Sequence, residues 1–398
     1  MNLDYLYNPD YAKKYFGKDH FAFKPLGFRT IENGMILPHT NTGDDGKWTW
    51  LGVGGIVDGN GDYVKESFIH YGVGGAYTPD PESIQESSET VIYLGISFHI
   101  WGHCITDNIR RVWFFKSQFM NQFRKCPIVY ISWAGRDLEN QKNFRRLLEI
   151  LGIDVDKVRQ ITQPTRFAKI ILPDESFFVT NNRKFTGEYC ETIDYIRDFA
   201  LSHRTPSANK KIYYLHDKNQ FGEERIAECF KDKGYEIIQP EKLTLDEQLN
   251  LLINAESFVS ILGSSSHNSI FLRDGTESIF ICRTANNFTV YQEALNQIRP
   301  MNSVTYIDSS LSLFGTYCYI ISRQLKKFLG EEFDGYTEED FKVFLEYVKT
   351  SLSKGLTIKP NIKEAYAEVL KEFLPQLKQH KELIATYNLP ADWEKVLS

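Results

Sequence analysis

The sequence has few of the features that define membrane-spanning, secreted or disulfide-bonded proteins. No stretch reaches the roughly 18 consecutive apolar residues of a spanning helix. Residues 1–18 have no apolar signal core. The six cysteines form no C-x-x-C pair and no zinc spacing, which favours free thiols in a reducing compartment. We therefore expect a cytoplasmic protein, with peripheral contact at the cytoplasmic membrane face left open.

Two nucleotide-binding motifs and an excess of positive charge are also absent. The chain contains no G-x-G-x-x-G fingerprint and no Walker A motif. Its net charge is −6 and its pI is about 5.9, which argues against nucleic acid as a partner. The chain has 398 residues, which is more than one typical hydrophobic core accommodates, so two domains are expected. It is also rich in aromatic residues, with 28 Phe and 22 Tyr.

The spacing of apolar and turn residues predicts an α/β protein. Residues 1–90 are rich in glycine and aromatics and form a β-rich, antiparallel lead-in to the N-terminal domain. Residues 91–203 alternate between strand and helix patterns, which is typical of a parallel, doubly wound sheet. The polar segment 202–211 is the best candidate for a linker.

A second alternating run covers residues 204–330 and predicts a second Rossmann-like domain. We expect it to end in a long helix over residues 311–329. Residues 331–398 are predicted to form a C-terminal helical extension with regular apolar faces. Two such domains imply a ligand at the carboxyl ends of their strands, in a cleft between the halves.

A strand over residues 258–262 is followed by a small, hydroxyl-rich loop. A strand, such a loop and the start of a helix can bind an anion, because the first helical N–H groups have no partners. A well-capped helix in an α/β core is an equally good interpretation. The candidate anion-binding residues are Gly263, Ser264, Ser265, Ser266 and Asn268.

Three polar residues at strand ends are further candidates for contact with a phosphate-bearing ligand. His216 and Lys218 follow the strand predicted over residues 212–215, and both can face a diphosphate. A solvated loop is the alternative for these two. Glu241, after the strand over residues 235–239, is a weaker candidate for contact with a ribose.

The segment 102–113 carries residues suited to acid–base chemistry. His103 and Asp107 are four residues apart, so a helix places them on one face, where a carboxylate and an imidazole can form a general base. Arg111 can orient Asp107 or bind a phosphate, and an Asp107–Arg111 ion pair is the structural alternative. Asn108 joins Arg111 as a candidate substrate-binding residue.

Metal binding is not expected from the sequence. His99 lies four residues before His103, but no third ligand is evident, and we place His99 with the substrate-binding candidates. Asp154-Val-Asp156 is the one D-x-D motif, and its position after Gly152 predicts a loop.

Two motifs, at residues 102–113 and 262–268, resemble those of family 61 glycosyltransferases and occur in the same order along the chain. Gly102-His103, Asp107, Arg111 and Trp113 match the family's G-H-x3-D-x3-R-x-W signature. The segment LGSSSHN over residues 262–268 resembles its HGAGLTN donor loop, with Phe271 following. The resemblance covers about residues 30–310. Leu262 stands where the family usually has His, and His216 where an Arg often follows the strand.

The resemblance implies a GT-B architecture and inverting transfer from a nucleotide-diphosphate sugar, here uridine-linked. Asp107 or His103 would act as the base, and the acceptor would be a glycan or a lipid-linked saccharide in surface or capsular polysaccharide synthesis. No cofactor or metal is expected. Two rivals are a pyruvyl transferase of similar architecture and a non-catalytic glycan- or nucleotide-binding protein. A serine hydrolase using Ser265 is disfavoured because no G-x-S-x-G or triad order is evident.

Overall fold

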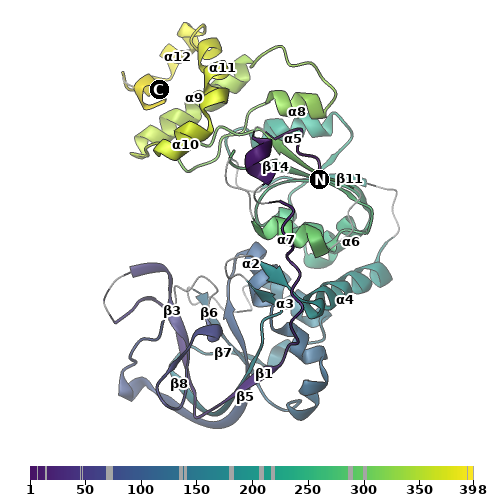
Figure 1. Cartoon of the computed structure of the whole chain (residues 1–398), viewed down its shortest axis with the longest axis vertical. Helices are drawn as coiled ribbons and strands as arrows, with labels where there is room; N and C mark the ends of the chain where they lie inside the picture. The colour runs from purple at the N-terminus through teal and green to yellow at the C-terminus, as the bar shows by residue number, and fades with distance from the viewer. Residues whose placement is uncertain are drawn as a thin grey trace. The chain divides into compact units, whose positions relative to one another are not determined.

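The fold consists of two compact units, which we describe separately. Unit 1 comprises Met1–Lys18, Thr205–Leu243 and Asn250–Ser398, and unit 2 comprises Asp19–Arg204 and Thr244–Leu249. Figure 1 gives the labels used below. The computed structural model describes residues 1–6, 8–13, 16–44, 46, 48–68, 75–133, 138, 141–178, 183–205, 210–216, 220–285, 290–298, 303–391 and 393–397.

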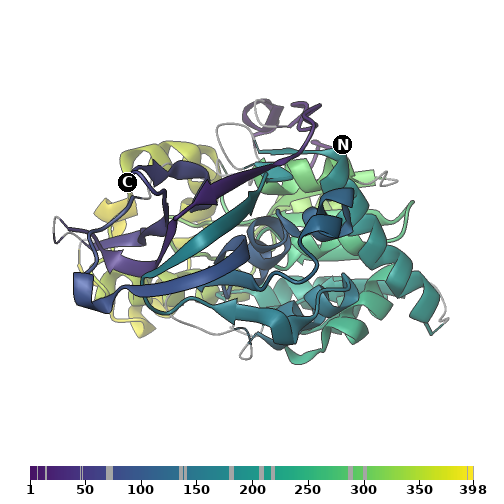
Figure 2. The same cartoon turned by 90° about the horizontal axis from the view of Figure 1, so that it is seen from below.

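Unit 2 is built on a mixed eight-stranded sheet. Strands β8, β5, β6 and β7 pair in parallel, whereas β1, β2, β3 and β4 pair antiparallel with β8 or with one another. Figure 2 shows the purple N-terminal strands beside the blue and teal strands of the same sheet. The bounds are β1 Phe28–Glu32, β2 Met35–Thr42, β3 Trp48–Val57, β4 Tyr63–Val64, β5 Gln85–Ser97, β6 Ile128–Ser132, β7 Val158–Gln160 and β8 Thr165–Pro173.

Short helices follow β5, and two regular helices complete unit 2. After β5 come α2 Trp101–His103, the π-helix η3 Cys104–Asn108 and the 3-10 helices η4 Val112–Lys116 and η5 Gln118–Gln122. An ordinary helix was expected to place His103 and Asp107 on one face, so the π turn is a correction. The remaining elements are α3 Lys142–Ile150, the short hairpin of β9 Phe177–Phe178 and β10 Lys184–Phe185, and α4 Gly187–His203.

Unit 1 contains a five-stranded parallel sheet in the order β12-β11-β13-β14-β15. Its central strands are apolar runs because both faces of the sheet are covered, by α5 and α8 on one side and α6 and α7 on the other (Figure 1). The bounds are β11 Lys210–Tyr214, α5 Glu223–Lys231, β12 Glu236–Ile238, α6 Leu245–Ile253, β13 Ala255–Ile261, β14 Glu277–Cys282, α7 Val290–Ile298, β15 Ser303–Asp308 and α8 Arg323–Phe328. Helix α6 is divided between the units, because its residues up to 249 belong to unit 2.

The first residues of the chain belong to unit 1, although the sequence analysis placed them in the N-terminal domain. The backbone N–H of Asn2 donates to the carbonyl of Val304 over 2.8 Å, and Asn2 forms a parallel bridge with Thr305. The N-terminal segment, including α1 Pro9–Lys13, therefore extends the edge of the parallel sheet at β15.

The long helix expected over residues 311–329 is wrong. Only Arg323–Phe328 is helical, with the Ser322 side chain capping Leu325 N. Residues 311–322 instead turn back at Gly315, whose φ is +75°. Leu311 N donates to Cys318 O, and Tyr319 N donates to Phe221 O. Backbone groups that a helix would have paired internally are satisfied by neighbouring segments, and this tertiary pairing overrides the local pattern.

The C-terminal helices pack on unit 1 through the apolar faces that the sequence predicts. They are α9 Glu338–Ser353, α10 Pro360–Ala365, α11 Ala367–Leu377, α12 Lys381–Thr386 and α13 Trp393–Leu397. Phe344 and Phe373 are fully buried in the resulting core. Asp340 joins α9 to α5 through Arg225, with 2.7 Å between the charged atoms. Within the described parts of the chain, no helix has the length and apolar character needed to cross a membrane.

Candidate active site

The first candidate site lies in unit 2, just beyond the carboxyl end of β5. His103 ends α2 and Asp107 lies in η3, so the tight helical path brings them together. Nδ1 of His103 lies 2.6 Å from Oδ2 of Asp107, and the Thr106 hydroxyl donates to the same oxygen over 3.0 Å. The predicted carboxylate–imidazole pair is therefore present in the structure.

The two members of this pair differ in exposure. The Asp107 side chain is completely buried, whereas 22% of the His103 side chain is exposed. The imidazole stacks on Phe98, with ring centroids 4.7 Å apart. Nε2 of His103 has no hydrogen-bond partner among the described residues. The carboxylate thus holds one ring nitrogen, while the other is positioned to meet a substrate hydroxyl.

Arg111 does not pair with Asp107. Its guanidinium donates to the Pro173 carbonyl over 3.0 Å and to Glu175 over 2.9 Å, and it is fully buried. Burial and the adjacent charge of Arg110 lower the pKa of Arg111 to about 10, although Glu175 opposes this shift. Arg110, which the sequence analysis did not consider, lies 3.8 Å from Asp107. The reason is the π turn, whose wider spacing breaks the four-residue alignment of an α-helix.

Arg111 and Trp113 both fasten the motif to the end of β8. The Trp113 indole N–H donates to the Asp174 carbonyl over 2.8 Å, next to the Pro173 and Glu175 contacts of Arg111. Only 5% of Trp113 is exposed. The contacts of these two residues are structural, and they hold the segment that carries His103 and Asp107.

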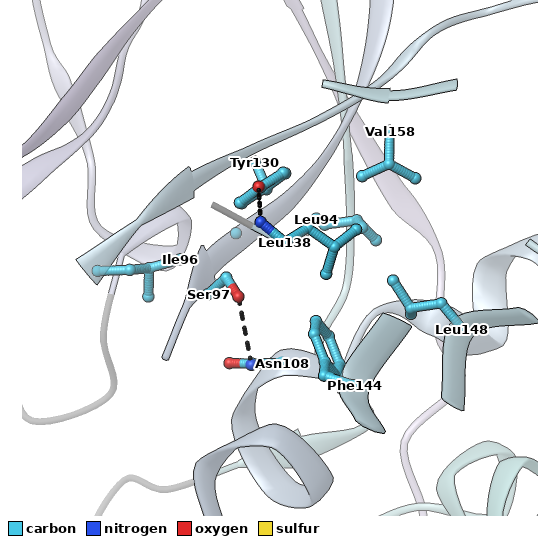
Figure 3. Close-up of a pocket in the computed structure, with 10 residues that line it drawn as sticks. Leu94, Ile96, Ser97, Asn108, Tyr130, Leu138, Phe144, Leu148 and Val158 are labelled. Atoms are coloured by element: carbon cyan, nitrogen blue, oxygen red, sulfur yellow. Dashed lines mark hydrogen bonds between the residues drawn. The ribbon is translucent and has the colours of Figure 1, made fainter. Parts of the chain in front are cut away.

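Asn108 and His99 occupy different environments beside this pair. Asn108 accepts a hydrogen bond from Phe98 N and donates to Phe98 O, each over 2.9 Å. Its amide faces a cavity of about 10 Å³ between Ser97 and the apolar side chains of the core, as Figure 3 shows, which is the size of a single water. His99 stacks on Trp133, with ring centroids 5.0 Å apart. Asn108 therefore locks the end of β5, an orienting role within the protein.

The second candidate site is the loop over residues 263–268 in unit 1, at the carboxyl end of β13. The helix that follows is a 3-10 helix of six residues, η9 Ser266–Phe271. Gly263 N donates to the Ser266 hydroxyl, Ser266 N to the Gly263 carbonyl, and Asn268 N to the Ser265 carbonyl, over 3.0, 3.1 and 3.2 Å. These N–H groups are satisfied within the loop, so the predicted anion site made of unpaired helical N–H groups is not formed by them.

The side chains of this loop divide into two sets. Ser266 and Asn268 are buried and face inward, where Ser266 contacts Gln292 over 2.6 Å and Asn268 donates to the Ser265 carbonyl over 3.0 Å. Gly263 and Ser264 are partly exposed, and Ser265 is 6% exposed. Two of the five predicted donor-binding residues thus shape the loop, and the other three line its accessible side.

His216, after β11, belongs to a chain of three polar groups at this edge. Its Nδ1 lies 2.8 Å from Oε1 of Glu223, and its Nε2 lies 3.4 Å from the Ser265 hydroxyl. The backbone N–H of His216 donates to the same carboxylate oxygen over 3.2 Å. Glu223 is the first residue of α5, and the turn before it uses Gly222 with φ +82°. The carboxylate is fully buried, so it fixes the imidazole against the loop.

The order carboxylate, imidazole, hydroxyl is the one found in serine hydrolases, and the sequence analysis did not anticipate it. Such enzymes use the N–H of the residue after the nucleophile to bind an oxyanion. Here Ser266 N already donates to Gly263 O over 3.1 Å. The Ser265–His216 distance of 3.4 Å also exceeds that of an activated nucleophile. The three groups therefore define a polar edge of the loop and not a hydrolase site.

The remaining site candidates are peripheral to these two groups. Glu241 is exposed in the 3-10 helix η8 Pro240–Lys242 after β12, and its charge adds to the effect of burial in raising the pKa of Tyr214. Lys218 lies outside the described residues. Asp154 and Asp156 pair with Lys157 and Arg145 on the surface. Across the described ranges, no three His, Cys, Asp or Glu side chains cluster as metal ligands.

Sequence reasoning missed Glu223 and Arg110. Glu223 stands in the first turn of a helix that the pattern did predict, seven residues after His216. Glu223 could have been predicted by looking for an acidic residue at the start of the helix that follows a histidine at a strand end. Arg110 had no such signal, because its position depends on the π turn.

Both groups lie on sheets with parallel strands in an α/β chain, each at a carboxyl strand end, where enzymes of this class bind their ligands. Residues 101–279 match the sequence model of glycosyltransferase family 61, a segment that contains His103, Asp107, His216, Glu223 and the loop. The chain therefore carries a family 61 glycosyltransferase domain.

Other comparisons found only distant similarity. The fold was matched to the crystal structure of the bacterial iron-containing dodecameric glycosyltransferase TibC from enterotoxigenic E. coli H10407. That match has 12% sequence identity, a TM-score of 0.26, and covers 68% of this chain and 81% of the other. No curated protein matches the sequence.

Proposed function

We propose that this glycosyltransferase moves a sugar from a nucleotide-diphosphate donor, a UDP-sugar, to a hydroxyl of a glycan or lipid-linked acceptor with inversion. Inversion in one step needs a base for the acceptor hydroxyl and a binding site for the leaving diphosphate. The observation that carries the proposal is the His103–Asp107 pair, with 2.6 Å between Nδ1 and Oδ2.

We assign the base to His103 and the orienting role to Asp107. A base must come within hydrogen-bond reach of the proton it removes. Asp107 is completely buried, whereas 22% of the His103 side chain is exposed, so the imidazole is the member that can reach a hydroxyl. As Nε2 takes the proton, the carboxylate at Nδ1 stabilises the imidazolium that forms.

The donor side of the proposal rests on His216 and the accessible part of the loop in unit 1. Ser264 and Ser265 supply hydroxyls, and His216 presents Nε2 to the same edge while Glu223 fixes its ring. Side chains of this kind can donate hydrogen bonds to the oxygens of a diphosphate. Gly263 keeps the backbone close to the ligand because it has no side chain.

The cellular setting stays part of the same proposal. We place the enzyme in the cytoplasm, with peripheral contact at the membrane face, building a surface or capsular polysaccharide. The family 61 domain favours sugar transfer over the pyruvyl-transferase alternative. A non-catalytic binding protein would bind nucleotide sugars but transfer nothing.

A two-stage experiment tests the function. A thermal-shift screen of nucleotide sugars, free nucleotides and phosphoenolpyruvate comes first, and we expect stabilisation by UDP and a UDP-sugar. The stabilising donor is then incubated with saccharide acceptors, and proton NMR of the first product reports the anomeric configuration. Retention of configuration, or stabilisation by phosphoenolpyruvate alone, would contradict the proposal.

A further inference from the structure

Arg283 follows the carboxyl end of β14, on the same sheet edge as the loop after β13. The two strands are parallel neighbours, and Leu262 N donates to the Ile281 carbonyl over 2.9 Å, so their ends run side by side. A Cβ added to Gly263 would meet Nη2, Cζ and Nη1 of Arg283 at 2.5, 2.7 and 3.1 Å. The guanidinium therefore lies flat against the Gly263 backbone. Residue 263 must be glycine for this contact, and its φ of +150° also favours glycine.

The guanidinium of Arg283 has no acidic partner. Its side chain forms no hydrogen bond or ion pair with any of the described residues, and its Nε is buried without a hydrogen-bond partner. Besides Gly263, the guanidinium contacts Tyr317, whose ring centroid lies 4.8 Å from Cζ of Arg283. The positive charge of Arg283 also acts on Tyr319. Burial raises the pKa of this phenol, and the charge of Arg283 opposes that shift.

An unpaired buried donor is costly unless something else satisfies it. Arg110 and Arg111, in unit 2, show the usual solution, because both lie within 3.5 Å of Glu175. Arg283 has its backbone fixed by Ser312, which donates to the Arg283 carbonyl over 2.7 Å. The described residues thus hold an arginine in place at a strand end and provide no carboxylate partner for its charge.

The loop over residues 263–268 does not itself supply the positive charge that would neutralise a bound anion. Three of its backbone N–H groups are used internally, and its hydroxyls are neutral. His216 is already paired with the buried carboxylate of Glu223. Of the groups described at this edge, Arg283 is the one whose positive charge no carboxylate offsets.

We infer that Arg283 binds the diphosphate of the donor, with its N–H edge directed to the phosphates and its face supported by Gly263 and Tyr317. This inference rests on the proposed function and adds a residue that lies outside the segment matching the family. Arginine suits the task because its planar fork donates two parallel hydrogen bonds to phosphate oxygens.

The test compares a nucleoside diphosphate with the same nucleoside lacking phosphates. Isothermal titration with UDP and with uridine is carried out on the full chain and on Arg283→Met, Arg283→Lys and Arg273→Met. Methionine keeps the apolar stem over Tyr317 and removes the charge. Arg273 is the matched control, because it lies in the turn before the amino end of β14 and its side chain makes no recorded ion pair among the described residues.

We expect Arg283→Met to raise the Kd for UDP roughly tenfold to hundredfold, as for the loss of charge-assisted hydrogen bonds. Arg283→Lys should fall between this variant and the parent, because a lysine keeps the charge without the fork. Affinity for uridine, and the unliganded melting temperature, should change little, and Arg273→Met should match the parent.

Two different failures are distinguishable. If the parent binds no nucleoside diphosphate, the proposed function fails and this inference with it. If the parent binds UDP and Arg283→Met binds it equally well, the function stands and Arg283 is a structural residue stacked on Tyr317. An equal loss for uridine and UDP would also overturn the inference.

Discussion

The two units each contain a histidine held by a buried acid, but the two pairs are built differently. In unit 2, His103 and Asp107 are four residues apart within one run of helical turns. In unit 1, His216 and Glu223 are seven residues apart, on opposite sides of a turn between β11 and α5. The first pair is a product of local geometry, whereas the second depends on the turn at Gly222, which Tyr319 holds in place through its hydrogen bond with Phe221.

The second nitrogen of each imidazole gives the more instructive difference. Nε2 of His103 has no partner among the described residues, while Nε2 of His216 lies 3.4 Å from the Ser265 hydroxyl. One ring is therefore suited to receive a proton from a substrate, and the other to bind and orient a ligand at a loop. Under the proposed function, the first pair serves catalysis and the second serves donor binding, and three variants test that division. A fourth variant tests the ionisation of a buried carboxyl elsewhere in unit 1.

The largest effect is expected for His103→Gln. Loss of a general base reduces kcat by on the order of 10² to 10⁴. Donor affinity should stay unchanged, because this histidine lies in the pair assigned to the acceptor. Transfer rates and UDP titration measure both quantities, and His203→Gln, an exposed histidine at the end of α4, is the control. Near-normal turnover in His103→Gln would show that His103 is not the general base.

Asp107→Asn should have the next largest effect, a fall in kcat on the order of 10². The amide fills the same space and can still accept a hydrogen bond, but it no longer stabilises a charged imidazolium. A larger loss than in His103→Gln would reverse the roles of the two residues. Circular dichroism and melting temperature confirm that the buried substitution leaves the fold intact.

Glu223→Gln should raise the KM for the donor about tenfold, a change of roughly 1.4 kcal/mol, with little change in kcat. The expected cause is a His216 ring that is no longer held against the loop by a charged partner. Glu224→Gln is the matched control, since Glu224 is the exposed neighbour on the same helix. A fall in kcat at unchanged KM would instead place this pair in the chemical step.

The smallest effect concerns Asp308, a buried carboxyl that has no basic partner among the described residues. Burial raises its pKa to about 7, although hydrogen bonds from Ser310 oppose the shift. The folded protein therefore holds a proton that the unfolded chain releases, so this group makes stability fall as pH rises from about 4 to 7 and beyond. Asp308→Asn removes that dependence.

We expect the unfolding free energy of Asp308→Asn, relative to the parent, to increase by roughly 1 kcal/mol between pH 6 and pH 8. Urea unfolding at several pH values measures this difference. A difference that is constant with pH would show that Asp308 is ionised throughout the range and has a partner in solution. Transfer activity should be unaffected at a temperature where both proteins are folded.

The regular parts of this fold could be predicted from the sequence, because apolar periodicity is strong there. The strands predicted over residues 212–215, 235–239 and 258–262 each lie within a few residues of β11, β12 and β13. These elements bury continuous apolar faces, so local pattern and tertiary environment agree.

The failures occurred where tertiary pairing decides the backbone. Residues 311–322 carry a helix-like pattern but pair with Phe221 and Ser309. The π turn at residues 104–108 put Arg110, in place of Arg111, beside Asp107. Of the site, the His103–Asp107 pair could be predicted from spacing. Glu223 could have been found as an acid at the start of the next helix, whereas Arg283 required knowledge of which strand ends are neighbours.

The closed hydrogen bonding of the loop over residues 263–268 has a consequence for the rate of the reaction cycle. Three backbone N–H groups of this segment are already bonded within it, so less ordering entropy is lost on ligand entry. Under the proposed function, association then needs little backbone rearrangement at this loop, and departure of the spent nucleotide depends on the strength of a few side-chain contacts. Weakening one such contact should therefore shorten the residence time of the product and leave the association rate constant nearly unchanged.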